Sequence, residues 1–131
     1  MTYSAGSTGH FQYRVTSDIN YKENITFSDE KYLDRLSNLS IINFDWNRFL
    51  INNTALENRY ENRNIGISAQ ELETEIPELV ENIEYLGRSI KSINVMSLFT
   101  VLIRSIQELK NKNDDLEGKV NLIAKHLELA I

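Results

Sequence analysis

A serine, an aspartate and a lysine lie close together near the start of the sequence, at Ser17, Asp18 and Lys22. A serine hydroxyl becomes a good nucleophile when a neighbouring base takes its proton, and a neutral lysine amine can serve as that base. The peptide bond between Ser17 and Asp18 is directly beside the hydroxyl. The spacing therefore raises the hypothesis that the chain cuts its own backbone next to Ser17.

Two geometries could bring this lysine to this serine. A lysine acts as a base only when neutral, which requires burial or a nearby positive charge to lower its pKa from about 10.4. The adjacent Glu23 opposes that change. Five extended residues span up to about 17 Å, so Ser17 and Lys22 cannot meet along a straight strand. Either the chain turns between them, or Lys22 reaches Ser17 of a neighbouring chain.

The side of Ser17 on which the chain would be cut also has two alternatives. Attack by a serine on its own carbonyl closes a strained four-membered ring, so a cut after Ser17 favours a nucleophile from elsewhere. Attack on the side of Val15 and Thr16 would place the cut before Ser17. His10 is a further candidate helper for either reaction.

The composition is that of one folded domain that is not expected to bind a metal ion or a cofactor. At 131 residues, with 41% hydrophobic and 25% charged residues, the chain is long enough for a modest core. A net charge of -5 argues against a nucleic-acid surface. With no cysteine and only two histidines, neither a metal site nor a cofactor is expected. No apolar run reaches the roughly 20 residues of a membrane span and no signal peptide is evident, so we expect a cytoplasmic chain when it is made.

The elements around the serine and lysine are predicted to be short. Residues 11–26 alternate polar and apolar groups, which suits extended segments around a turn. The stretch SIINFDWNRFLI predicts a strand with Phe44 and Trp46 on one face, where they would anchor the core. Between these segments, helical spacing predicts a short amphipathic helix that has Ser28 as its N-cap and carries Tyr32, Leu33, Leu36 and Leu39.

The middle of the chain predicts the rest of a mixed α+β body. Residues 53–64 are polar and suit an exposed loop. The stretch NIGISAQELETEIPELV passes from a strand into a helix that Pro77 ends, with Glu71 and Glu75 facing water. Gly87 lies between two alternating runs, which is typical of a β-hairpin.

The last third of the chain carries the strongest periodic pattern, an unbroken heptad repeat. Apolar residues recur at the a and d positions, as in the seam of a coiled coil. A single amphipathic helix packed on its own globular body is the alternative. Strict spacing to the last residues favours self-association. The a positions are Phe99, Ile106, Asn113, Val120 and Leu127, and the d positions are Leu102, Leu109, Leu116, Ile123 and Ala130.

Other residues of the repeat bear on strand number and helix stability. Asn113 at a would fix register and strand number at some cost in stability. Lys112 at g and Glu117 at e have the spacing of an interchain ion pair in a parallel coiled coil. Branched residues at a with leucine at d lean by themselves towards two strands. Gly118 weakens the helix by about 1 kcal/mol relative to alanine, and His126 at g is interpreted as a solvated residue on the rim.

Four blocks of the sequence, taken in order, resemble the chaperone-of-endosialidase family, also called the S74 peptidase family. SDINYKENI is similar to its opening Ser-Asp pattern, and YLDRLSNLSIINFDWN to its helix and Phe-Asp-Trp strand. NIGISAQELETEIPELV resembles its Ala-Gln-Glu and Pro-Glu-Leu-Val signature, and KSINVMSLFTVLIRSIQELK its last strand entering the long helix. Ile19 and Ser68 depart from the family pattern, but neither departure changes the residues at the Ser17, Asp18 and Lys22 positions of that pattern.

The resemblance implies an architecture and a role. Members of this family are C-terminal intramolecular chaperones of phage tailspikes, tail fibres and neck appendages. Residues 1–17 would be the end of an upstream stalk, 18–95 the chaperone body, and 96–131 the helix of a parallel trimeric coiled coil. The homotrimer would promote folding of the upstream β-helical part of the same polypeptide in the host cytoplasm. The released domain would be absent from the mature virion, and no nucleic acid or membrane would take part.

The resemblance also implies residue roles. Ser17 would be the nucleophile, Lys22 the general base and Asp18 the first residue of the released domain, in a single-turnover Ser/Lys peptidase without other substrates. A second Ser-Asp pair, Ser28 and Asp29, is explained by a helix N-cap and is assigned no catalysis. The alternative function is a structural coiled-coil cap or adaptor that stays uncut on its fibre.

Overall fold

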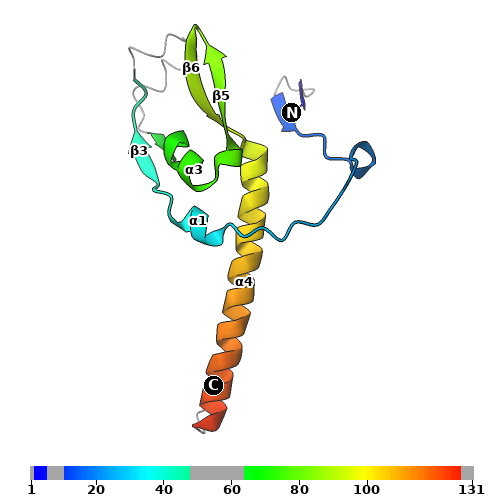
Figure 1. Ribbon diagram of the computed structural model, residues 1–131, viewed down its shortest axis with the longest axis vertical. Coiled ribbons are helices and arrows are strands. Elements are labelled where there is room, and N and C mark those ends of the chain that lie inside the picture. The colour runs from blue at the N-terminus through cyan, green and yellow to red at the C-terminus, as the bar shows by residue number, and fades with distance from the viewer. Residues whose placement is uncertain (1, 6–10, 48–63, 128–131) are drawn as a thin grey trace. The chain divides into compact units, whose positions relative to one another are not determined.

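The computed structural model describes residues 2–5, 11–47 and 64–127, and it has the mixed α+β fold that the sequence predicts (Figure 1). Short antiparallel strand pairs and short helices precede a long C-terminal helix. The chain divides into two compact units, Met1–Glu30 and Lys31–Ile131. The predicted loop at 53–63, His10 and Ala130 lie outside the described residues.

The first unit holds the serine and the lysine of interest. Strand β1 (Thr2–Ala5) pairs antiparallel with β2 (Phe11–Arg14), with Thr2 opposite Arg14. A short 3-10 helix, η1 (Ile19–Tyr21), follows. The prediction of extended segments around a turn is therefore correct for the strand at 11–14. The turn lies at Ile19–Tyr21 and is a 3-10 helix.

The second unit begins with α1 (Leu33–Ser37), β3 (Ile42–Phe44) and β4 (Asn64–Gly66), and the two strands pair antiparallel. Helix α3 (Ala69–Glu75) leads into the 3-10 helix η2 (Pro77–Leu79). The hairpin of β5 (Val80–Tyr85) and β6 (Arg88–Ile93) then joins the long helix α4 (Val95–His126).

The prediction that Ser28 is the N-cap of the first helix is wrong. Helix α1 starts later, at Leu33, and the Ser28 hydroxyl instead accepts a hydrogen bond from the Glu30 backbone N–H at 3.2 Å. The side chain of Tyr32, the N-cap residue of α1, makes no capping hydrogen bond. Instead, Oε2 of Glu108 in α4 accepts hydrogen bonds from the backbone N–H groups of Tyr32 (2.8 Å) and Leu33 (3.0 Å). The start of α1 is thus set by a distant helix, because a carboxylate stabilises exposed N–H groups at a helix N-terminus.

The core lies where α3, η2 and α4 meet. Its buried residues are Leu72, Ile76, Leu79 and Val101, against which Tyr32, Leu36 and Leu39 of the α1 region pack as predicted. Ser68 is the N-cap of α3 and accepts a hydrogen bond from the Glu71 backbone N–H at 3.2 Å. Helix α3 ends before Pro77, as the sequence predicts, because proline lacks the N–H that would continue it.

Phe44 and Trp46 do not anchor this core, contrary to the prediction. They are half-buried and pack edge to face, with ring centroids 5.1 Å apart. A Cβ atom at Gly66 on the paired strand would lie 3.1 Å from the Phe44 ring, so the ring lies over a backbone that has no side chain at this point. The two aromatic residues form a pair of their own beside β4, separate from the core.

The hairpin around Gly87 is present as predicted. Its two turn residues, Leu86 and Gly87, have positive φ angles of 50° and 75°. Positive φ at both central residues is typical of the two-residue turn that matches the twist of antiparallel strands. The hairpin leads through Asn94, which accepts a hydrogen bond from the Ser97 backbone N–H at 3.0 Å, directly into α4.

Candidate functional site

Ser17 and Lys22 are in contact within a single chain. The Lys22 ammonium Nζ donates a hydrogen bond to the Ser17 hydroxyl Oγ at 3.0 Å. This distance is within the reach required of a nucleophile and its base. Of the two geometries that the sequence left open, the structure contains the one in which the chain turns between the two residues.

The 3-10 helix η1 makes that turn. Asp18 is its N-cap, and Asp18 Oδ1 accepts from the Asn20 backbone N–H at 2.9 Å and from Asn20 Nδ2 at 3.0 Å. The backbone N–H of Tyr21 donates to the Asp18 carbonyl and that of Lys22 to the Ile19 carbonyl, both at 3.1 Å. The chain therefore rises far less than an extended segment would, which keeps Lys22 near Ser17.

The environment of the pair is open to water among the described residues of the first unit. Each side chain from Val15 to Glu30 is exposed. A lysine amine loses its proton readily only when it is desolvated or lies near another cation. The first unit thus supplies the contact between Ser17 and Lys22, and the described side chains of 15–30 do not supply the burial.

The a and d residues of the heptad repeat are exposed along the whole described helix. The exposed fractions of the apolar ones run from 41% at Leu102 to 67% at Ile106. Different positions of α4 face the body: Val101 and Ser105, at c and g, are buried. The body therefore covers one face of α4, while the a and d face has no cover within the described part of the chain.

Several charged residues of α4 form ion pairs within the chain. Lys110 Nζ lies 2.6 Å from the Asp114 carboxylate, and this hydrogen bond and its charge raise the pKa of Lys110. Lys119 lies 2.9 Å from Asp115. Lys112, predicted to pair with Glu117 of another chain, lies 3.4 Å from Asp34 in the first turn of α1. Any interchain pair of Lys112 would compete with that contact.

The acidic face of α3 does more than face water, which corrects the interpretation of Glu71 and Glu75. Glu71 Oε1 accepts from the Ser40 backbone N–H at 2.9 Å, and Glu75 Oε2 accepts from Asn38 Nδ2 at 3.2 Å. Both carboxylates therefore hold the segment after α1 against α3. The sequence signal was weak, because acids spaced one helical turn apart are also typical of a solvated face.

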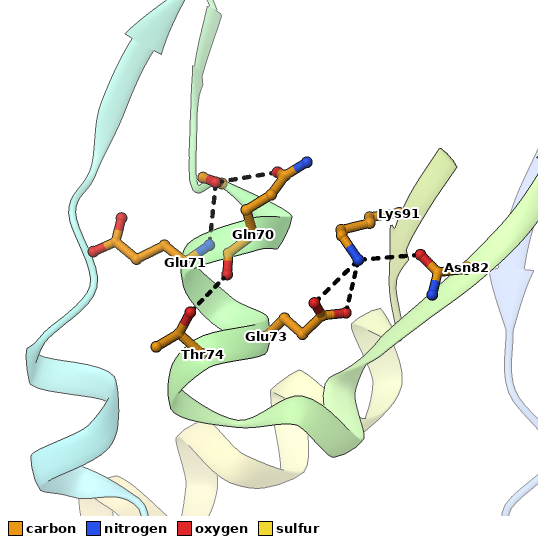
Figure 2. Close-up of polar contacts among 7 residues, drawn as sticks. Gln70, Glu71, Glu73, Thr74, Asn82 and Lys91 are labelled. Carbon is orange, nitrogen blue, oxygen red and sulfur yellow. Dashed lines mark hydrogen bonds and ion pairs between the residues drawn. The ribbon is translucent and has the colours of Figure 1, made fainter. Parts of the chain in front are cut away.

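Sequence reasoning missed the polar link between α3 and the hairpin, shown in Figure 2. Lys91 Nζ lies 3.0 Å from both carboxylate oxygens of Glu73 and 3.1 Å from Asn82 Oδ1. Lys91 and Asn82 are register partners on β6 and β5. Because side chains alternate along a strand, register partners such as Lys91 and Asn82 lie on the same face of the hairpin. The predicted hairpin register could therefore have identified the contact between Lys91 and Asn82. The link joins α3 to the hairpin that precedes α4.

No group of three or more histidines or acids among the described residues is arranged to hold a metal ion. None of the described helices is both long and apolar enough to cross a membrane. His126 is the exposed last residue of α4.

Comparisons with known proteins bear on the same segment. Residues 17–81 match the family model described as Peptidase_S74, chaperone of endosialidase. The chain is similar to the long tail fiber protein Gp37 of Enterobacteria phage M1, with 28% identity over 116 residues, and to that of Enterobacteria phage Ox2, with 26% identity over 115 residues. Each match covers 88% of this chain and 44% of the relative, so the chain spans less than half the length of these relatives. The family match begins at Ser17 and includes Lys22.

Proposed function

This chain belongs to the chaperone-of-endosialidase family, and from that premise we propose that it is a self-cleaving assembly chaperone of a phage fibre. It brings three chains together, promotes folding of the fibre part upstream, and is then released by a cut next to Ser17. The tail fibre relatives support the fibre context. The process takes place in the host cytoplasm during virion assembly, and the released domain is absent from the mature virion.

Assembly through the a and d face of α4 is supported by its exposure. A row of large apolar side chains is costly to leave in water, and burial stabilises each by about 1.5–3 kcal/mol. Every described side chain from Leu109 to Ile123 is exposed in the single chain. Three parallel copies would bury this seam and set the register of the chain ends. A fixed register helps an intertwined β-structure to fold, because its non-local contacts form slowly.

The observation that carries the proposed cleavage is the hydrogen bond of 3.0 Å between Lys22 Nζ and Ser17 Oγ. In the reaction, neutral Lys22 takes the Oγ proton while Oγ bonds to a carbonyl carbon. The peptide C–N bond breaks, its nitrogen leaves with the proton that Lys22 returns, and an ester remains on Ser17. Water hydrolyses that ester to a carboxylate and restores the hydroxyl.

Two carbonyl carbons fit this chemistry. The Thr16 carbonyl of the same chain closes a five-membered ring with Ser17 Oγ and gives a released domain that starts at Ser17. The Ser17 carbonyl of a neighbouring chain avoids the four-membered ring and gives a domain that starts at Asp18. The two products differ in mass by one serine residue.

Assembly would also supply the cover that the described residues of the first unit do not provide. Ser17 and Lys22 touch but are exposed, and covering them would favour the neutral amine that the reaction needs. Cleavage would therefore follow trimer formation, and the chaperone would leave only after its work is done.

Intact-mass analysis of the purified chain with its upstream fibre part tests the proposal. We expect a released domain that starts at Ser17 or Asp18, and we expect only full-length protein from Ser17→Ala and Lys22→Ala. Ser28→Ala in the second Ser-Asp pair is the matched control and should be cut normally. A wild-type protein that assembles but remains full length would contradict the cleavage and favour an uncut coiled-coil cap.

A further inference from the structure

We propose that Asp18 is a positioning residue for the Ser17–Lys22 pair, because its carboxylate folds the turn that carries Lys22 back to Ser17. The inference rests on the proposed self-cleavage and concerns a side chain that takes no part in the chemistry itself. Asp18 lies between the two reacting groups in sequence and is the N-cap of η1. Its carboxylate oxygen Oδ1 accepts two hydrogen bonds, both from Asn20.

The turn has little else to hold it. None of the residues of η1 is buried, so apolar packing within the unit does not stabilise it. Its backbone contributes two hydrogen bonds of 3.1 Å, from Tyr21 to Asp18 and from Lys22 to Ile19. Such a short helix is marginal in water because nucleation fixes several dihedral angles for few hydrogen bonds. The two bonds to Asp18 Oδ1 therefore make a large part of its stability.

The 3-10 helix η1 ends directly before Lys22. The Lys22 backbone is extended, with φ -110° and ψ 145°, and Asn24 has a positive φ of 53°. No continuing helix stabilises η1 from this end. The position of the Lys22 amine relative to the Ser17 hydroxyl thus depends on the cap at Asp18.

Substitutions at residue 18 separate a capping role from a charge effect. Asp18→Asn and Asp18→Ala both remove the negative charge, but only asparagine keeps an oxygen that can cap the turn. N-cap preference ranks asparagine, aspartate and serine above threonine and glycine, and all of these above alanine and valine. Loss of such a cap shifts the equilibrium between turn and open chain by roughly 2- to 30-fold.

The decisive measurement is the first-order rate of domain release, followed by intact mass, in the assembled protein. We expect wild-type, Asp18→Asn and Asp18→Ser to be cut at similar rates, Asp18→Gly more slowly, and Asp18→Ala and Asp18→Val roughly 2- to 30-fold more slowly. The order follows capping strength and not charge or side-chain size. Equal rates for Asp18→Asn and Asp18→Ala, whether fast or slow, would overturn the proposal.

A second readout keeps the inference testable apart from cleavage. In a Ser17→Ala background, amide hydrogen exchange at Tyr21 and Lys22 reports the turn itself. We expect faster exchange with Asp18→Ala than with Asp18→Asn, and a smaller increase with Asn20→Ala, which removes only the Nδ2 donor. Unchanged exchange in Asp18→Ala would refute the role of the cap. A protein that shows the exchange pattern but never releases a domain would refute the proposed cleavage and leave the turn assignment standing.

Discussion

Ser17 and Lys22 meet because the three residues Ile19–Tyr21 wind into a 3-10 turn. The contact is made of neighbours in sequence and needs no second chain. What the described part of the first unit lacks is a covered environment for the amine. At the scale of residues, formation of the pair is therefore local, and we propose that its activation depends on assembly.

Arginine at position 22 tests whether the lysine is a base or only a hydrogen-bond donor. Lys22→Arg keeps a positive charge and several N–H donors that can reach Ser17, but a guanidinium does not lose its proton in proteins. We expect no released domain by intact mass, while trimer formation stays normal. Release from the Lys22→Arg protein would show that the side chain only positions the serine.

The sequence could raise the pairing of Ser17 with Lys22 but not choose its geometry. Spacing along an extended chain excluded a straight strand and left a turn or a neighbouring chain. The choice depends on two hydrogen bonds between Asp18 and Asn20. Asp-x-Asn occurs in many loops without forming a helix, so the pattern alone did not predict the cap.

At the scale of elements, α4 has one face that packs on the rest of its unit and one apolar face that is exposed. Val101 and Ser105, at a c and a g position in its first three turns, pack on the body, and its a and d positions remain exposed. The heptad pattern predicted the second face. It did not reveal that Glu108 caps α1, because a carboxylate at a c position is equally typical of a solvated helix surface. Ser28 predicted the wrong start of α1 for a related reason. The group that bonds the first N–H groups of α1 is Glu108, which is distant in sequence.

Glu108 should be important for stability because it satisfies two backbone N–H groups. Loss of the acceptor for partly buried donors costs about 1–3 kcal/mol. We expect Glu108→Ala to lower the free energy of unfolding by about that amount, and Glu108→Gln to lower it less because its amide oxygen still accepts. Urea unfolding at one fixed protein concentration measures both.

Gln107→Ala provides the control for this series, because Gln107 is the exposed neighbour of Glu108 on the same helix. Its free energy of unfolding should stay within about 0.5 kcal/mol of the wild type. Equal unfolding curves for Glu108→Ala and Gln107→Ala would show that the carboxylate does not anchor α1.

At the scale of the whole molecule, the seam on α4 should control both assembly and cleavage. Leu116 and Leu122 are exposed leucines of the same helix, at 59% and 69%, but only Leu116 is at a seam position. We expect Leu116→Asp to abolish the trimer and the cut together, because it puts a charge in each of three facing positions. Leu122→Asp should assemble and be cut like the wild type.

Sedimentation and intact mass of the same samples measure the two effects side by side. Normal cleavage in a Leu116→Asp protein that sediments as a monomer would break the proposed link between assembly and cutting. Equal loss of assembly in both variants would mean that the interface is not the a and d face.

Co-assembly of Ser17→Ala chains with Lys22→Ala chains tests the central claim most directly. Each chain then lacks one member of the pair, and a mixed trimer contains intact Ser17 and Lys22 only on different chains. Because Lys22 contacts Ser17 of its own chain at 3.0 Å, we predict that mixed trimers, identified by mass, release no domain while wild-type trimers do. A released domain from the mixed trimers would contradict the account, since it would show that Lys22 serves the serine of a neighbouring chain.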